Sequence, residues 1–176
     1  MQVLIEDEIL CLIPYTHDDD LELYKCYKDK HSILGFNYKL SGSFDQFQKM
    51  INIDLYPFWA TILHKSTQKK IGCVRLSPFA SSPDLSIWIY KRYRRHGYGR
   101  RAYCLALRYC FFELGFTEIL ANCYEDYEAG RRFLESLHFA RNPSHDLNER
   151  SVVTGKLVKQ LGYQITNIDF VTYVYK

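Results

Sequence analysis

The stretch from residue 85 to residue 102 constrains the fold of this chain more than any other. It begins as an apolar strand pattern, Leu-Ser-Ile-Trp-Ile, continues as a basic loop containing Gly97 and Gly99, and then runs into a helical pattern. The first N–H groups of a helix have no partner within the helix, and the helix dipole favours negative charge there. Glycine also lets the backbone come close to a ligand. The stretch therefore predicts a phosphate-binding loop between a strand and a helix.

Positive charge is concentrated around this loop. Six cationic side chains surround it: Lys91, Arg92, Arg94, Arg95, Arg100 and Arg101. The whole chain has a formal charge of +3, from 23 Lys and Arg against 20 Asp and Glu, so the rest of the chain, with 17 basic residues against 20 acidic ones, is net −3. Basic character confined to one loop favours a small polyanionic ligand and disfavours a broad nucleic-acid surface.

Length and composition are those of a folded globular protein. The 176 residues, 47% of them hydrophobic, fit one domain over residues 1–176. The N-terminus is acidic where a signal peptide would be basic, and no apolar run of about 18 residues occurs, so we expect a cytoplasmic protein without membrane attachment. The six cysteines lack zinc-like spacing, which predicts buried free thiols and no metal. Residues 18–20, all Asp, are typical of a solvated helix start.

Hydrophobic periodicity predicts an α/β chain. Strands are expected at 8–14, 58–63, 70–76, 85–89 and 117–123, and helices at 18–30, 44–54 (with Ser43 as its cap), 99–112 and 128–137. The second and third strands form an antiparallel hairpin. Residues 85–123 form a strand–helix–strand unit, whose strands should be parallel. Residues 157–165 and 168–175 both carry strand-like residues, so we expect a terminal hairpin without a fixed pairing.

The loop sequence Arg94-Arg95-His96-Gly97-Tyr98-Gly99 matches R/Q-x-x-G-x-G/A, and the chain thereby resembles the GNAT superfamily of N-acetyltransferases. Three flanking segments, 84–89, 109–116 and 128–139, resemble the branch that acetylates the N-termini of ribosomal proteins. The resemblance covers about residues 84–139 clearly, and the order of the preceding elements also fits. It implies a central mixed, twisted sheet that splays between two strands, with helices on both faces and acetyl-CoA in the splay.

The resemblance also implies which residues contact the co-substrate acetyl-CoA. Backbone N–H groups from Arg95 to Arg100 would hold the pyrophosphate, arginine side chains would add contacts to phosphates, and the strand backbone would lie beside the pantetheine arm. The full implied set is Trp88, Ile89, Tyr90, Arg94, Arg95, His96, Gly97, Tyr98, Gly99, Arg100, Arg101, Tyr127 and Gly130. His96 is interpreted as a loop spacer rather than a base.

The chain departs from the family pattern on the later helix. Tyr127 stands where asparagine is common, Gly130 replaces a frequent serine, and His138 replaces a usual glycine. Many relatives carry there a tyrosine that protonates the leaving thiolate, and the matching residue in this chain is Leu134. No side-chain acid is therefore evident at that position, and solvent or another residue must serve.

Acetyl transfer needs a neutral amine, a polarised thioester carbonyl and a route for one proton. Asp84 aligns with an acidic position of relatives and is the first candidate base, directly or through water; Glu125, with Asp126 beside it, is the second. Each carboxylate could equally be a solvated loop residue. The tyrosines at 90, 93, 124 and 127 are candidates to line the acceptor cleft or to act as packing residues.

The sequence therefore predicts an acetyl-CoA-dependent N-acetyltransferase in which a bound amine attacks directly in a ternary complex. The acceptor is a protein N-terminus or a small amine, and the sequence does not separate the two. Two other functions stay open: a catalytically inactive relative that senses acetyl-CoA, and, with less support, an RNA-binding module that uses the arginines and tyrosines of residues 90–103. A homodimer is also left open.

Overall fold

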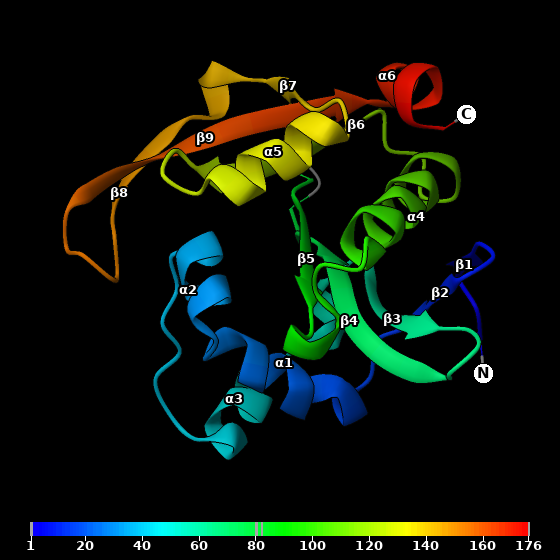
Figure 1. Cartoon of the computed structure of the whole chain (residues 1–176), viewed down its shortest axis with the longest axis horizontal. Coiled ribbons are helices and arrows are strands. Elements are labelled where there is room, and N and C mark those ends of the chain that lie inside the picture. Colours follow the sequence, from blue (N-terminus) through cyan, green and yellow to red (C-terminus); the bar gives the residue numbers. More distant parts are fainter. Residues whose placement is uncertain (1, 80, 82, 176) are drawn as a thin grey trace.

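The chain folds into two antiparallel sheets that part from one another (Figure 1), in a computed structural model that describes residues 2–79, 81 and 83–175. The first sheet contains, in spatial order, β1 (Ile5–Glu6), β2 (Leu10–Pro14), β3 (Trp59–His64), β4 (Lys69–Leu76) and β5 (Leu85–Ile89). In the second, the long β9 (Leu157–Thr166) pairs with β6 (Glu118–Tyr124), β7 (Ala140–Arg141) and β8 (Leu147–Arg150).

The two sheets meet at one point. Among the described residues, one parallel bridge joins Asp84 to Leu120, and the Leu120 N–H donates to the Pro83 carbonyl at 2.9 Å. Beyond this bridge β5 and β6 run in the same direction but separate. The expectation of a mixed, splayed sheet is confirmed. The strands predicted at 85–89 and 117–123 were expected to pair in parallel, but their parallel pairing is limited to this bridge.

Helices cover both faces of the first sheet, as expected. The described helices are α1 (Asp20–Tyr27), α2 (Lys30–Phe36), α3 (Phe44–Met50), α4 (Tyr98–Phe112), α5 (Glu128–Ser136) and α6 (Asn167–Asp169), the last continued by a π-helical turn at Phe170–Val174. Figure 1 shows α5 lying along β6 and β9, with α1, α2 and α3 gathered on the far side of the gap. None of these described helices has the length and apolar character needed to span a bilayer.

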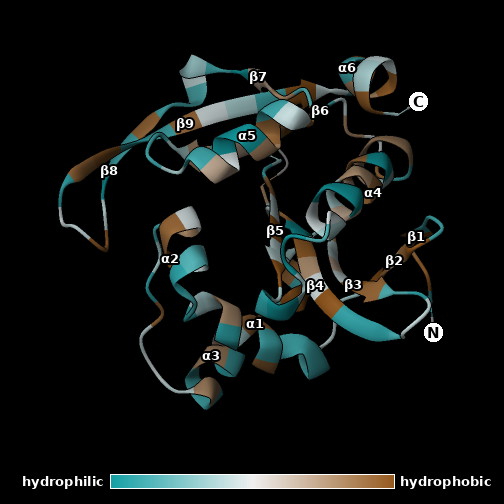
Figure 2. Ribbon diagram, in the orientation of Figure 1, coloured by the Kyte–Doolittle hydropathy of each residue, from teal (hydrophilic) through white to brown (hydrophobic). Residues whose placement is uncertain are grey.

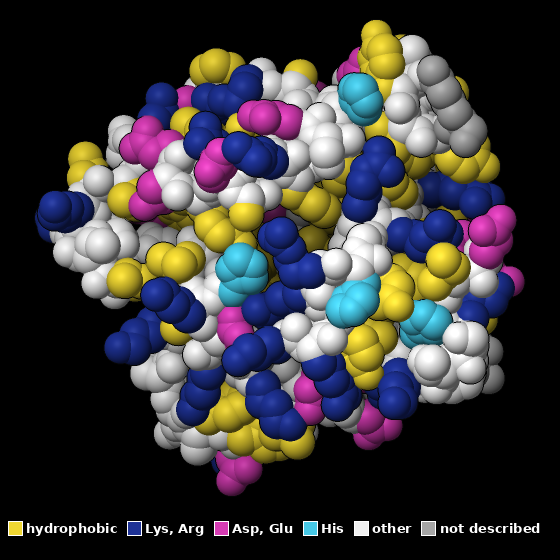
Figure 3. Space-filling view, viewed as in Figure 1, with side chains coloured by type: hydrophobic (Ala, Val, Ile, Leu, Met, Phe, Trp, Pro, Cys, Tyr) yellow, Lys and Arg dark blue, Asp and Glu magenta, His cyan; other side chains and the backbone are white. Residues whose placement is uncertain are grey.

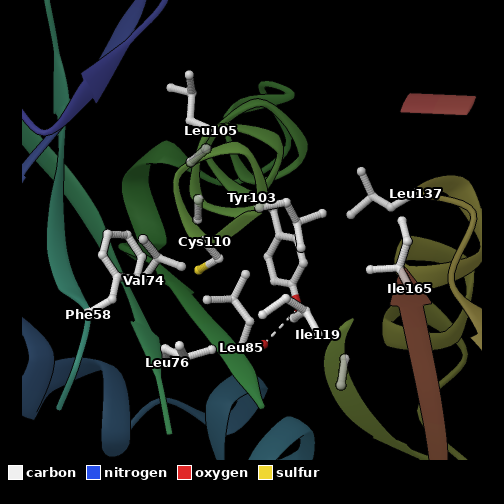
Figure 4. Close-up of a cluster of buried hydrophobic side chains, with 14 of the residues drawn as sticks. Phe58, Val74, Leu76, Leu85, Tyr103, Leu105, Cys110, Ile119, Leu137 and Ile165 are labelled. Carbon is white, nitrogen blue, oxygen red and sulfur yellow. Dashed lines mark hydrogen bonds between the residues drawn. The ribbon is translucent and has the colours of Figure 1, made fainter. Parts of the chain in front are cut away.

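The main core lies between α4 and the two sheets (Figure 4). Alternate residues of each strand point to it, such as Phe58 beside β3 and Val74 on β4, and α4 contributes Tyr103 and Cys110. The buried Tyr103 hydroxyl donates to the Leu85 carbonyl at 2.7 Å. Figure 2 shows the same division, with apolar residues along β3 and β4 and polar residues on the outer faces of the helices.

Local signals explain several element boundaries. Ser43 caps α3 in a capping box with Gln46, as the sequence predicts. Gly115, with φ +74°, lies just after the end of α4 in the left-handed conformation.

Two predicted elements are wrong. The helix expected over 18–30 ends at Tyr27, and α2 begins anew after Asp29, whose carboxylate accepts the His31 N–H at 2.8 Å. Residues 168–175 are not a strand, because a capping box between Thr166 and Asp169 starts a helical turn that buries Phe170. The terminal hairpin is formed instead by β8 and β9, which residues 151–156 connect.

The acidic run 18–20 is only partly solvated. Asp18 is exposed, but Asp19 and Asp20 are buried, which corrects the expectation of a solvated face. Asp19 accepts from the Thr61 hydroxyl at 2.7 Å and pairs with Lys70 at 2.8 Å. Asp20 accepts from the Tyr15 hydroxyl at 2.8 Å. These partners compensate the lost hydration of both carboxylates.

Candidate active site

A cleft of about 600 Å³ opens where β5 and β6 separate. Its walls come from α2, β5, the loop before α4, β6 and α5. The described lining residues include His31, Gly35, Asp84, Ser86, Ile87, Trp88, Ile89, Tyr93, Arg94, Arg95, Gly99, Asn122, Cys123, Tyr127, Gly130, Phe133 and Leu134. Figure 3 shows Lys and Arg side chains gathered across the middle of this face of the molecule.

The strand edge facing the cleft offers backbone hydrogen-bonding groups. The Tyr90 N–H donates to Ile71 O at 2.9 Å, and the Ser77 N–H donates to Asp84 O at 2.8 Å, so the even-numbered residues of β5 pair with β4. Because antiparallel pairing alternates, the N–H and C=O groups of Ile87 and Ile89 point away from β4 toward the gap. The carbonyl of Ile89 accepts from Arg94 Nε at 2.8 Å.

This register revises one expectation about the strand. Trp88 and Tyr90 use their backbone groups within the sheet, and their side chains are buried, each 3% exposed. The cleft edge is therefore formed by Ile87 and Ile89. The sequence identified the strand, but only the pairing with β4 decides which residues face outward.

The loop before α4 has the geometry of an anion-binding turn. Arg95 and Gly97 have positive φ values of +66° and +79°, and Gly97 is the N-cap of α4, with no side-chain hydrogen bond at the cap. His96 Nδ1 lies 2.7 Å from the Arg94 carbonyl oxygen, a contact within the loop that stabilises its conformation. The first N–H groups of α4 are thus left without a side-chain cap, at the positive end of a helix of 15 residues.

The arginines of this loop have different hydrogen-bond and ion-pair partners. Arg94 donates to Asp29 at 2.9 Å, and Arg101 pairs with Asp7 at 2.8 Å. Burial acts to raise the pKa of Asp7, but the backbone N–H groups of Leu10 and Ile9 and the guanidinium of Arg101 together lower it below its usual value. Arg100 reaches the Ser136 carbonyl at 3.4 Å. Arg95 is exposed, lines the cleft and has no ion pair with any described carboxylate.

Asp84 sits at the inner end of the cleft, where the two sheets meet. Its carboxylate accepts from Asn122 Nδ2 at 2.6 Å and from the Ser86 hydroxyl at 3.3 Å. Burial raises the pKa of Asp84 to about 6, while these two hydrogen bonds and the charge of Arg75 act in the opposite direction. A carboxylate with a pKa near neutrality is suited to accept a proton.

Glu125, the second candidate base, has a different position. It is exposed, accepts the Lys159 N–H at 3.3 Å, and is not among the described residues that line the cleft. Asp84 is thus the candidate carboxylate that the fold brings to the cleft.

The start of α5 forms the opposite wall. The Tyr127 hydroxyl lies 3.3 Å from His31 Nδ1 of α2, so the two walls touch across the cleft. A Cβ added at Gly130 would lie 2.6 Å from Cys123 Sγ and 2.7 Å from the Tyr127 ring, so the serine of many relatives would not fit here without a shift. Leu134 is buried and lines the cleft, and it supplies no acid.

Among the four tyrosines considered for the acceptor cleft, Tyr93 and Tyr127 line it. Tyr90 is buried beneath the first sheet, and Tyr124 is buried with its hydroxyl donating to Glu149. The contribution of α2 was missed, because residues 18–30 read as one helix. The Asp29 N-cap was the signal that could have identified a second helix.

Comparison with known proteins agrees with this geometry. Residues 10–140 match the family model described as an acetyltransferase (GNAT) domain. Among curated protein sequences, none matches the chain.

Solved structures share the fold. A spermidine N-acetyltransferase from Vibrio cholerae, in complex with CoA and spermine, superposes with a TM-score of 0.81 at 16% identity, over 94% of this chain and 99% of that one. A ribosomal-protein-S5-alanine acetyltransferase from Vibrio fischeri gives 0.72 at 17%, over 93% and 96%. A GNAT-family acetyltransferase from Bacillus anthracis gives 0.74 at 14%, over 92% and 97%.

Proposed function

Because the chain belongs to the GNAT family of acetyltransferases, we propose that it binds acetyl-CoA in the cleft between β5 and β6 and transfers the acetyl group to a primary amine by direct attack in a ternary complex. The observation that carries the proposal is the meeting of three features in one cleft. These are the outward-facing edge of β5, the uncapped start of α4 and the carboxylate of Asp84.

The residues present fit the chemistry of acetyl-CoA. The backbone groups of Ile87 and the N–H of Ile89 match the amide groups of a pantetheine arm, as an added strand would. The N–H groups from Gly97 to Arg100 and the side chain of Arg95 suit a pyrophosphate. When bound, acetyl-CoA supplies a thioester whose carbonyl carbon an amine can attack.

The proposed step needs no nucleophilic side chain. The amine nitrogen forms a bond to the carbonyl carbon, the C–S bond breaks, and the amine loses one proton. Asp84 accepts that proton, directly or through water, and an outward N–H of β5 polarises the carbonyl. Cys123 takes no covalent part, because burial raises the pKa of its thiol to about 11 and keeps it neutral. With Leu134 on α5, the thiolate takes its proton from solvent or from another residue of the cleft.

The acceptor is a primary amine, on a small molecule or at a protein N-terminus. The structural neighbours named for spermidine and for the alanine of ribosomal protein S5 support both kinds. We place the protein in the cytoplasm as part of the same proposal, since all six of its cysteines are unpaired thiols.

Blocking the cleft tests the co-substrate site. Gly99 faces the cleft, and a Cβ there would lie 3.5 Å from Ile89 and 3.9 Å from Phe133. Gly99→Phe should therefore reduce acetyl-CoA affinity at least tenfold by isothermal titration calorimetry. Arg132→Phe, which adds the same ring on an exposed face of α5, is the control and should bind like the wild type. Unchanged affinity in a folded Gly99→Phe protein would contradict the site. A screen of amines for acetyl-CoA consumption then tests the transfer.

A further inference from the structure

A second hollow, of about 370 Å³, lies next to the cleft on the face of the first sheet that α1 and α3 cover. We call it the aromatic pocket, because half of the described residues that line it are aromatic: Tyr27, Phe36, Tyr38, Phe47, Tyr56, Trp59 and Trp88. Phe36, Ser86 and Trp88 line both hollows, so the aromatic pocket adjoins the cleft, and one of these shared residues, Ser86, donates to Asp84.

Among the described residues that line this pocket, Arg75 is the charged one. The Arg75 guanidinium carbon lies 4.4 Å from the ring centroid of Tyr56, 4.9 Å from that of Trp59 and 5.1 Å from that of Trp88. Such distances are typical of cation–π contacts, so the electron-rich faces of three rings are already occupied by a cation of the chain itself.

Arg75 interacts with Asp84 through its charge. It is half-buried, and none of the described carboxylates forms an ion pair with it. None of the described residues lining the aromatic pocket is Asp or Glu. A polycationic amine would therefore meet a positive charge and no carboxylate, whereas an anion would gain a partner for a partly desolvated guanidinium.

The position of Arg75 relates this charge to the reacting groups. Arg75 is paired across the strands with Ser86, whose hydroxyl donates to Asp84 at 3.3 Å. An anionic group held at Arg75 would thus be close to an amine held at Asp84, as in a molecule that carries both groups on neighbouring atoms. The aromatic rings of the pocket that Arg75 does not cover would accommodate a planar apolar group of the acceptor.

From this geometry we propose that the aromatic pocket is the acceptor site, and that the acceptor is a small primary amine carrying a carboxylate or similar anion together with a planar apolar group. Arg75 binds the anion and selects against polyamines. The inference rests on the proposed acetyl transfer and names the class of its acceptor.

Matched acceptors test the role of the anion. Acetyl-CoA consumption is measured with L-phenylalanine and L-tyrosine, with their uncharged carboxamides, and with spermidine. The acids should exceed their amides at least tenfold in kcat/KM, and spermidine should be the poorest. An equal rate with acid and amide, or a preference for spermidine, would overturn the proposal.

Variants of Arg75 separate anion binding from an effect on Asp84, because the two groups also interact through their charges. Arg75→Gln should raise KM at least tenfold for the acids and leave KM for the amides nearly unchanged, and Arg75→Lys should restore part of the difference. If Arg75 acted only through Asp84, acids and amides would change together and the pH dependence of kcat would shift for both.

Binding can be read without any acetyl transfer. The only two tryptophans of the chain, Trp59 and Trp88, both line the aromatic pocket, so tryptophan fluorescence reports its occupancy. L-Phenylalanine should change this fluorescence in the wild type at concentrations at least tenfold lower than in Arg75→Gln. Binding with no transfer to any amine would contradict the proposed function and leave the anion site standing. Transfer without such binding would contradict the anion site alone.

Discussion

At the scale of the residue, the most informative side chain is Asp84. Burial where the sheets meet raises its pKa to about 6, and Ser86, Asn122 and Arg75 keep it from rising further. Its ionised form is therefore present at neutral pH but is lost in mild acid. The same shift affects stability: the folded protein holds this proton more tightly than an ordinary Asp, whose pKa is 3.8, so the contribution of Asp84 to stability falls as the pH rises from about 4 to about 6.

Asp84→Asn tests its role as a base. The variant should lose about 10²–10⁴-fold in kcat, because it has no group to accept the amine proton. In the wild type, activity should rise with pH through about 6 as Asp84 ionises, and the variant should lack this rise. Acetyl-CoA consumption between pH 5 and pH 9 measures both.

Glu125→Gln is the matched control for this experiment, since it removes a carboxylate that lies outside the cleft lining. It should keep both the rate and the pH dependence of the wild type. An Asp84→Asn protein that retained the rise near pH 6 would assign the proton to another group.

At the scale of the element, the loop before α4 and the N-terminus of that helix carry arginines of two kinds: some form ion pairs within the fold, and Arg95 faces the cleft. Arg94 and Arg101 are held by Asp29 and Asp7, so part of the basic loop is used within the fold. This division also weakens the view of residues 90–103 as an RNA-binding stripe, because two of its arginines are already paired.

Arg95→Ala and Arg101→Ala form a matched pair, since each removes one guanidinium from the same loop region. Arg95 lines the cleft, so Arg95→Ala should weaken acetyl-CoA binding about tenfold, the cost of one charge-assisted contact. Arg101→Ala should leave affinity within about twofold and lower the free energy of unfolding by no more than about 1 kcal/mol, as expected for a partly exposed ion pair. Calorimetric titration and urea unfolding measure these effects. Equal losses of affinity in both variants would indicate a general charge effect.

At the scale of the whole molecule, the cleft exists because two sheets are joined at a single bridge and then separate. α4 packs against both sheets, and the Tyr103 hydroxyl of this helix donates to the Leu85 carbonyl at the edge of β5. The shape of the site therefore depends on packing among three separate elements.

Tyr103→Phe tests the hydrogen bond from the Tyr103 hydroxyl to the Leu85 carbonyl. The ring would still fill the core, but the Leu85 carbonyl would lose its buried donor, which should lower the free energy of unfolding by about 1–3 kcal/mol. Urea unfolding followed by circular dichroism measures the loss. Cys110→Ala, which removes a small buried side chain of the same helix without breaking a hydrogen bond in this edge, provides the packing comparison. No loss of stability in Tyr103→Phe would mean that solvent reaches the Leu85 carbonyl.

Local signals determined much of this protein. Several features depend on neighbours in the sequence. They are the glycines and arginines of the loop before α4, the cap at Ser43, the hairpin of β3 and β4, and Gly115 just after α4. They could therefore be predicted from the sequence, and so could the fold class.

Only the tertiary structure decided which groups meet. The pairing of β5 with β4 turned Ile87 and Ile89 outward. The sheet junction partly buried Asp84 and left Glu125 exposed, and rings from distant segments enclosed Arg75. After β9, the local capping box between Thr166 and Asp169 starts the helical turn, and the packing of Phe170 against Phe111 of α4 is the tertiary contact that buries it. The physical reason is the same in each case: strand register, desolvation and ring packing arise from contacts between residues far apart in the chain, which local sequence patterns do not encode.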